Sequence, residues 1–227
     1  MKSIFGTGYD SEPKFDNQDG HQMHPVVNTD FISLAKKRRS VYALGKNVLI
    51  SQYEIAGLIK DAVKQAPSAF NSQSSRVVIL FGRDHGILWN MTREKLRKIV
   101  PPENFQSMAE RISSFADSAG TVLFFEDQDT VKSLQEQYPG YAENFPVWSE
   151  QSSGMAQYAV WLALAEKGLG ANLQHYNPLI DEEVHTGWNV PASWKLRAQM
   201  NFGSTVKKVE DKDYIEDSDR FIIPNRT

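Results

Sequence analysis

The chain has 227 residues, of which 41% are hydrophobic and 23% charged, and this length favours one domain, or at most two, with a core that needs no disulfides. The absence of cysteine excludes disulfides, thiolate metal sites and cysteine nucleophiles, and it fits a reducing compartment such as the cytoplasm. The formal net charge of −3 argues against a nucleic-acid partner, and no run of about 18 apolar residues indicates a membrane span.

The first 28 residues differ from the rest of the chain. They contain several Gly, Pro, Asp and Asn residues and no sustained apolar period, so we expect an irregular arm over 1–28 and a folded domain over 29–227. His21 and His24 form an H-x-x-H pair within this arm. No helical pattern or further ligand accompanies the pair, which favours a solvated loop over a metal site.

Amphipathic helices dominate the first half of the remaining chain. Ser51 and Glu54 form a capping-box pattern, and apolar residues follow at helical spacing until Pro67. The sequence predicts, in chain order, a helix over Phe31–Arg39 with its cations in the last turn, a helix over Ser51–Ala66, a polar loop over Pro67–Ser75, a strand over Val77–Phe81, and helices over Ile87–Val100 and Glu103–Ser118.

The second half contains the most apolar segment, Gly154–Lys167, which we expect to be a helix buried in the core or in a subunit interface, with Gly168 as its C-cap. The other predicted elements are a strand over Thr121–Phe125, a helix over Thr130–Gln137, an aromatic loop over Tyr138–Trp148, a strand over Ala171–Tyr176, a helix over Asp181–Val184, a strand over Leu196–Phe202 and a brief β-like run over Phe221–Ile223. Together they predict one α+β domain whose central sheet is wrapped by helices.

Several catalytic motifs are absent from the sequence. It contains no phosphate-binding loop and no complete dinucleotide fingerprint, so a nucleotide-type ligand needs side chains to hold its phosphate. It also lacks the G-x-S-x-G nucleophile elbow and the H-E-x-x-H zinc helix. These absences remove most of the support for a hydrolase.

Two constellations could bind such a ligand. Arg38, Arg39 and Ser40 offer guanidinium and hydroxyl donors suited to phosphate, although a basic pair at a helix end is also typical of a solvated terminus. Asn71 and Gln73 carry a donor and an acceptor on one planar group, so they could pair with the edge of a heteroaromatic ring such as a flavin pyrimidine. An ordinary turn-rich loop is the alternative for that segment.

The third constellation, residues 172–178, follows the buried helix at the end of a predicted strand. Strand ends commonly carry ligand contacts in sheet proteins. His175 is the titratable group of this segment, and a lone histidine is often a structural residue with satisfied hydrogen bonds. The segment therefore has both a ligand-binding and a structural interpretation.

In combination, these three motifs resemble the nitroreductase family of FMN-dependent oxidoreductases, and in particular its short fatty-acid-repression (Frm2-like) branch. The matching segments are R-R-S-V-Y-A-L from Arg38, P-S-A-F-N-S-Q-S-S-R from Pro67 and G-L-G-A-N-L-Q-H-Y-N-P from Gly168, and the resemblance covers about residues 29–223. It implies an α+β fold with a central, mostly antiparallel sheet wrapped by helices. It also implies a domain-exchanged homodimer that holds FMN at the subunit interface with residues from both chains.

The resemblance also implies roles for individual residues. Arg38 and Ser40 match contacts to the FMN phosphate and ribityl chain, and Arg39 lies beside the pyrimidine end. Residues that match the loop on the ring edge, contributed across the interface, are Asn71, Gln73 and Ser74. Residues that match the segment beside flavin N5 are Leu173, Gln174 and His175. A basic residue near the C-terminus should also reach the phosphate, and the candidates are Lys212 and Arg220.

The implied activity is hydride transfer from NAD(P)H through FMN to a nitroaromatic, quinone or similar small-molecule acceptor, by a ping-pong mechanism without a catalytic acid or base from the protein. Only Asn177 to Pro191 occupies the region of the long helical insertion of larger nitroreductases, so the substrate face should be open. Two alternatives remain. One is a flavin-binding regulatory or stress-response protein, linked to lipid signalling or oxidative stress, with incidental redox turnover. The other is a partner-binding module without a cofactor.

Overall fold

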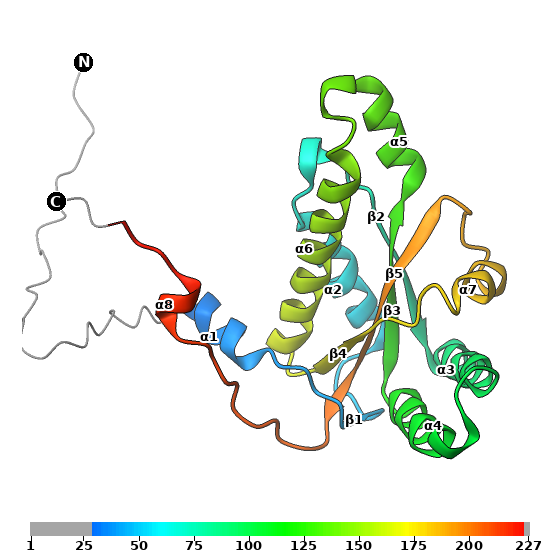
Figure 1. Ribbon diagram of the computed structural model, residues 1–227. Coiled ribbons are helices and arrows are strands. Elements are labelled where there is room, and N and C mark those ends of the chain that lie inside the picture. The colour runs from blue at the N-terminus through cyan, green and yellow to red at the C-terminus, as the bar shows by residue number, and fades with distance from the viewer. Residues whose placement is uncertain (1–28, 225–227) are drawn as a thin grey trace, which may run out of the picture.

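An antiparallel sheet of five strands forms the centre of the computed structural model, which describes residues 29–224 (Figure 1). The strands are β1 (Leu44–Gly45), β2 (Ser75–Phe81), β3 (Gly120–Asp127), β4 (Gly170–Gln174) and β5 (Trp194–Thr205). β3 pairs with β2 and with β5. β4 pairs with residues 199–203 of β5, and β1 pairs with residues 204–205. The long strand β5 therefore pairs with β1, β3 and β4, and β2 joins the sheet through β3.

Helices cover both faces of this sheet and divide the core in two (Figure 1). One face packs against α2 (Gln52–Gln65) and α6 (Phe145–Glu166), and the other against α3 (Gly82–Arg97), α4 (Pro102–Ala116) and α7 (Asp181–Gly187). Side chains alternate along β3, so Val122 and Phe124 join the α2/α6 core while Leu123 and Phe125 join the α3/α4/α7 core. Both faces of β3 are buried, which explains its continuous apolar run.

The remaining helices lie at the ends of the molecule. They are α1 (Asp30–Lys37), α5 (Gln128–Gln137), the four-residue α8 (Asp217–Arg220) and 3-10 turns at Ala69–Asn71 and Pro139–Tyr141. Figure 1 shows that the chain after β5 leaves the sheet and runs past α1 to α8. The Arg39 Nη1 group donates a hydrogen bond of 2.6 Å to the carbonyl of Glu210, which ties this C-terminal segment to the end of α1.

Local signals in the sequence identify two helix ends correctly. The Ser51 hydroxyl accepts from the Glu54 amide and the Glu54 carboxylate accepts from the Ser51 amide, so the predicted capping box begins α2. Gly168 adopts a φ of 77° just after α6, and the amides of Gly168 and Leu169 bond to the carbonyls of Ala165 and Leu164. This Schellman pattern confirms Gly168 as the residue that ends the helix.

Other predicted elements are wrong in extent or type. The aromatic loop predicted over Tyr138–Trp148 is instead a 3-10 turn followed by the start of α6 at Phe145, with Pro146 in a first turn that needs no amide donor. The β-like run at Phe221–Ile223 is exposed irregular chain, and no strand within residues 29–224 pairs with it. α3 begins at Gly82, directly after β2, and not at Ile87. The His21 and His24 pair lies outside the described residues.

Candidate functional site

The segment that follows α1 lies beside β4. Thr29 caps the start of α1, and Arg38 ends the helix in an extended conformation. Ser40 then forms a parallel bridge with Ala171, and the Val41 amide donates to the Ala171 carbonyl at 2.9 Å. The first and third sequence motifs, far apart along the chain, therefore meet in space.

Arg38 has unused hydrogen-bonding capacity. Its guanidinium carbon lies 4.6 Å from the ring centroid of Trp161 on α6, a cation–π contact. Arg38 Nε and Trp161 Nε1 are both buried without a hydrogen-bond partner among the described residues. Two buried donors without acceptors are costly, so their position beside one another fits an acceptor-rich ligand such as a phosphate.

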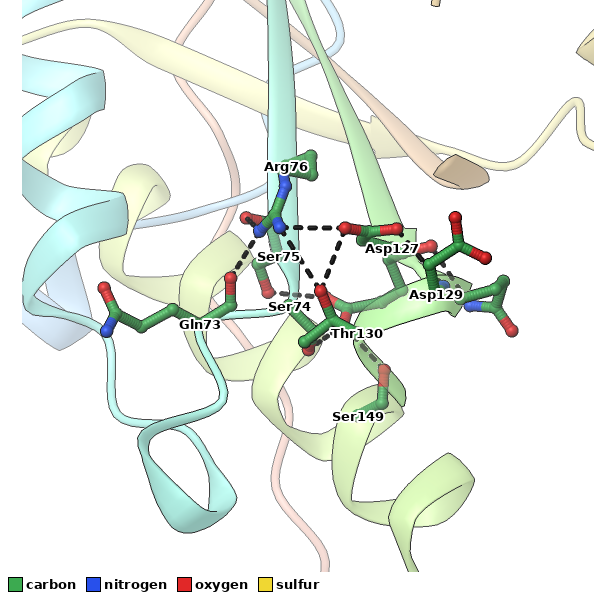
Figure 2. Close-up of polar contacts among 10 residues, drawn as sticks. Gln73, Ser74, Ser75, Arg76, Asp127, Asp129, Thr130 and Ser149 are labelled. Atoms are coloured by element: carbon green, nitrogen blue, oxygen red, sulfur yellow. Dashed lines mark hydrogen bonds and ion pairs between the residues drawn. The ribbon is translucent and has the colours of Figure 1, made fainter. Parts of the chain in front are cut away.

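The loop that carries Asn71 and Gln73 has an unusual backbone. Phe70, Asn71 and Gln73 have φ values of 55°, 50° and 48°, a left-handed conformation that is costly for residues other than glycine. The Gln73 amide is held by the Ser68 hydroxyl at 2.9 Å. Both Asn71 and Gln73 are exposed, and Figure 2 shows the Gln73 side chain pointing away from the polar cluster beneath it. The strained loop thus presents two amide groups to the exterior.

A buried carboxylate anchors this loop from below. Glu126, at the end of β3, is completely buried and accepts hydrogen bonds from the hydroxyls of Ser74 and Ser149, each at 2.6 Å, and from Ser75. Ser74 is only 1% exposed, so its hydroxyl hydrogen is used inside the protein. The Ser74 hydroxyl therefore holds the loop on Glu126.

The adjacent residue of β3 holds the same loop through an ion pair. Asp127 Oδ2 lies 2.9 Å from Arg76 Nη2 and accepts from the Thr130 hydroxyl at 2.9 Å, while Arg76 Nη1 donates to the Gln73 carbonyl (Figure 2). Burial opposes ionisation of Asp127, but hydrogen bonds from Ser193 and Thr130 and the charge of Arg76 hold its pKa below the usual value. We call Glu126, Asp127 and these partners the carboxylate cluster.

A pocket of about 350 Å³ opens beside the loop, between the 3-10 turn at Ala69–Asn71 and α6. Its lining residues are Ala69, Phe70, Trp148, Gln151, Ser152 and Met155. The rings of Phe70 and Trp148 are nearly parallel, at 21°, with centroids 6.0 Å apart. A pocket with aromatic walls and few polar groups suits a flat organic molecule.

A second set of polar side chains lies at the other end of β3, on the sheet face opposite to Glu126. Asn172 Nδ2 donates to the Val41 carbonyl at 2.8 Å, and Asn172 Oδ1 accepts from Gln174 and Asn201 at 2.9 and 3.1 Å. Asn201 in turn accepts from the Thr121 hydroxyl at 2.9 Å. The hydroxyl of Thr121 also contacts Trp89 Nε1 at 3.1 Å and His85 Nδ1 at 2.9 Å. We call this chain, from Val41 to His85, the amide network.

The other predicted site residues are placed as follows. Leu173 is half-buried in the α2/α6 core, Gln174 is buried in the amide network, and His175 is exposed just beyond the end of β4. Lys212 and Arg220 are both exposed on the C-terminal segment, over the rings of Tyr214 and Phe221 at 5.1 and 5.7 Å. Within one chain, the structure thus joins residues 38–41 to β4, whereas the loop at 71–74 leads into β2 and lies beside the Glu126–Asp127 end of β3.

The sequence motifs did not predict Phe70, Trp148 or Glu126 as site residues, and they gave Asn172 no role of its own. The only local signal for Glu126 is a pair of acidic residues, Glu126 and Asp127, that ends a long apolar run. Within residues 29–224, no group of three or more His, Asp and Glu side chains could hold a metal ion. In the same part of the chain, no helix is long and apolar enough to cross a membrane.

Comparisons with known proteins give this geometry a context. The Nitroreductase family pattern matches residues 35–204. HBN1 of Saccharomyces cerevisiae is 34% identical over 189 residues, which are 82% of this chain and 93% of HBN1. The chain belongs to the nitroreductase family. Nitroreductase FRM2 of the same yeast is 29% identical over 195 residues, 85% of this chain and 96% of FRM2, so the resemblance to the Frm2-like branch is confirmed.

Solved nitroreductases share the fold. Nitroreductase CinD from Lactococcus lactis, in complex with chloramphenicol, is 48% identical with a TM-score of 0.80 over 86% of this chain and 100% of CinD. A nitroreductase with bound FMN from Desulfitobacterium hafniense is only 15% identical, with a TM-score of 0.65 over 88% of this chain and 100% of that protein. These likenesses confirm the predicted α+β nitroreductase fold with an antiparallel sheet and helices.

Proposed function

We propose that this protein is an FMN-dependent oxidoreductase that reduces nitroaromatic, quinone or similar small molecules with NAD(P)H. The observation that carries the proposal is a pair of buried donors without partners among the described residues. Arg38 Nε belongs to the motif where the nitroreductase resemblance places the FMN phosphate, and Trp161 Nε1 belongs to the α6 ring that packs against Arg38. The bound FMN in the Desulfitobacterium hafniense relative supports the choice of cofactor. When bound, FMN supplies the two-electron chemistry, accepting a hydride from NAD(P)H and passing it to the acceptor.

The chain's own residues bind and orient the cofactor in this proposal. Arg38 offers a charge-assisted donor to the phosphate, with Ser40 beside it and Lys212 or Arg220 as a further cation. Arg39 lies toward the pyrimidine end, where a cation stabilises negative charge on the reduced ring. Asn71 and Gln73 would contact the ring edge, and the end of β4 at Leu173–His175 would border the redox-active part of the ring. No catalytic acid or base is required of the protein.

The acceptor class is supported by the pocket and by the relatives. CinD has been solved with 4-nitrophenol and with chloramphenicol, both nitroaromatic compounds, and also with nicotinic acid, whose ring resembles nicotinamide. The aromatic walls at Phe70 and Trp148 suit rings of this kind. We propose that donor and acceptor use the same place in turn, which gives ping-pong kinetics with parallel double-reciprocal lines.

We further propose that the protein acts as a homodimer with residues of both chains at each cofactor. The C-terminal segment supports this proposal, because Tyr214, Ile215, Ile222 and Ile223 are between 60% and 90% exposed there. Apolar side chains left uncovered on an extended segment are typical of a contact with another protein surface. A second copy would also bring a loop at residues 71–74 to the Arg38 region, which a single chain keeps apart.

Binding measurements with Arg38→Ala test the proposed function. If Arg38 holds the phosphate, this change should weaken FMN binding by about 10- to 150-fold, the equivalent of about 1.5 to 3 kcal/mol. Lys36→Ala, which removes an exposed cation of the same helix, is the control and should change the Kd by less than about twofold. Equal Kd values for the wild type and Arg38→Ala would contradict the assignment.

Turnover separates the enzyme from a flavin-binding regulatory protein. Reduction of bound FMN by NAD(P)H and reoxidation by a nitroaromatic at about 1 per second or faster supports the enzyme. His175→Gln should lower turnover by less than about tenfold, because loss of a general acid costs about 10²- to 10⁴-fold. A loss of the larger size with FMN still bound would make His175 a proton donor.

A further inference from the structure

Asn172 contacts both segments of the chain that the proposed function assigns to the FMN site. Its Nδ2 donates to the carbonyl of Val41, directly after the Arg38–Ser40 motif, and its Oδ1 accepts from Gln174 at the end of β4. We infer that Asn172 is a positioning residue that holds these two segments in a fixed relation for the cofactor. The inference rests on the proposed function, because FMN is the ligand whose binding it explains.

The orientation of the Asn172 amide follows from its partners. The Val41 carbonyl can only accept, so the group 2.8 Å from it must be the Asn172 NH₂. Asn172 Oδ1 then faces Gln174 Nε2 at 2.9 Å and Asn201 Nδ2 at 3.1 Å, and both of these donate. All three amides therefore have one consistent arrangement, and a flip of Asn172 would face the Val41 carbonyl with an oxygen.

Thr121 links the amides to the far end of the network. Asn201 Oδ1 accepts the only hydroxyl hydrogen of Thr121. The oxygen of Thr121 then accepts from Trp89 Nε1, a group that only donates, and lies 2.9 Å from His85 Nδ1. The hydrogen bonds from the Val41 carbonyl to Thr121 therefore each have one direction, and the buried ring of His85 ends the network.

Two consequences for the site follow from this order. Gln174 uses one of its two Nε2 hydrogens on Asn172, which leaves the other hydrogen and its Oε1 to meet a ligand. The backbone already attaches this segment to β4, because Ser40 forms a bridge with Ala171 and the Val41 amide donates to the Ala171 carbonyl. Asn172 adds a side-chain hydrogen bond to the Val41 carbonyl. Loss of Asn172 should free both the end of the Arg38–Ser40 segment and the Gln174 amide while leaving the sheet pairing intact.

FMN titration of matched variants tests the inference. Asn172→Leu removes both functions of the amide in a similar volume, and Asn172→Ser is a milder change whose short hydroxyl cannot span the same partners. Thr121→Val is the control, because it removes a buried polar group of the same network without touching either segment. We measure FMN Kd by quenching of flavin fluorescence, the visible spectrum of the bound flavin, and urea unfolding of the FMN-free protein.

We expect Asn172→Leu to weaken FMN binding by about tenfold or more and to shift the bound-flavin spectrum, with a smaller change in the same direction for Asn172→Ser. Thr121→Val should lower the urea midpoint to a comparable extent and keep the Kd within about twofold of the wild type. An unchanged Kd and spectrum in both Asn172 variants, or equal losses of affinity in Thr121→Val, would overturn the inference. A wild-type protein that binds no FMN would overturn the proposed function as well.

Discussion

The carboxylate cluster and the amide network both depend on β3, but they lie at opposite ends of the strand, and Glu126 and Thr121 point to opposite faces of the sheet. Glu126 faces α6 and is held by serine hydroxyls, whereas Thr121 faces α3 and joins a chain of neutral amides. The cluster fixes the loop at residues 71–74, and the network fixes the segment at residues 38–41 against β4. Each therefore stabilises a different wall of the proposed cofactor site.

The two differ in how their geometry is specified. A carboxylate accepts from several directions, so Glu126 can bind three hydroxyls from two segments without imposing an orientation on them. An amide has distinct ends, so the network at Asn172 fixes the direction of each hydrogen bond. The strained loop is thus held by a carboxylate that accepts from several directions, whereas the end of β4 is held by amides whose hydrogen bonds each have one direction.

Removal of the Glu126 carboxylate should have the largest effect on stability. Glu126→Leu leaves the hydroxyls of Ser74, Ser75 and Ser149 without their acceptor, and we expect a loss of about 3 to 4 kcal/mol in the free energy of unfolding. Urea denaturation measures it. Glu150→Gln changes a half-exposed carboxylate of α6 that pairs with Arg197 of β5, and it should cost about 1 kcal/mol or less. Similar losses in both variants would contradict a special role for the cluster.

The amide network should make the protein sensitive to mild acid. Burial lowers the pKa of His85 from 6.5 to about 4, although the carbonyls of Ala116 and Phe115 oppose the shift. The unfolded chain binds a proton near pH 6.5 and the folded chain only near pH 4, so stability present above pH 6.5 is lost as the pH falls. We expect a loss of about 3 kcal/mol across this window.

His85→Gln keeps a donor for Thr121 and cannot titrate, so its unfolding free energy should depend much less on pH between 6.5 and 4. Urea denaturation at several pH values compares it with the wild type. The same slope in both proteins would show that another group causes the acid sensitivity.

Protonation of Asp127, in the ion pair of the carboxylate cluster, should lower the stability at a lower pH than protonation of His85, and by a smaller amount. Asp127→Asn should cost about 1.5 kcal/mol at pH 7, because it removes a charged acceptor of Arg76 and Thr130. The folded pKa of Asp127 is depressed, so this stability is present above pH 3.8 and is lost as the pH falls through the folded pKa. The difference between wild type and variant should therefore shrink below pH 4.

Asp129→Asn is the control for this prediction, since it changes an exposed carboxylate two residues away. It should alter the unfolding free energy by about 0.5 kcal/mol or less. A constant difference between the wild type and Asp127→Asn from pH 7 to pH 3 would remove the ion pair as the cause.

Features that depend on neighbouring residues were predictable from the sequence, and features that depend on strand register were not. The Ser51 capping box and the Gly168 helix end are written within a few residues. The contact between Asn172 and Val41 joins positions 131 residues apart, and no local pattern carries that information. The same limit applies to Glu126, whose serine partners come from β2 and α6.

The start of α6 shows a different limit. Tyr138, Tyr141, Phe145 and Trp148 suggest an irregular loop because aromatic residues and prolines interrupt the helical spacing. In the structure their rings pack on Phe70, with centroids between 4.9 and 6.0 Å from it, so a tertiary contact stabilises the first turns of the helix. The same ring contacts form the wall of the pocket, so the sequence pattern predicted neither the start of the helix nor the pocket.

The visible absorption spectrum of the purified protein tests the central claim most directly, which is that the two polar clusters stabilise the walls of an FMN site. We predict a yellow protein with flavin bands that correspond to about one FMN per chain after incubation with the cofactor and removal of the excess. A colourless protein that retains no FMN after that treatment would contradict the account.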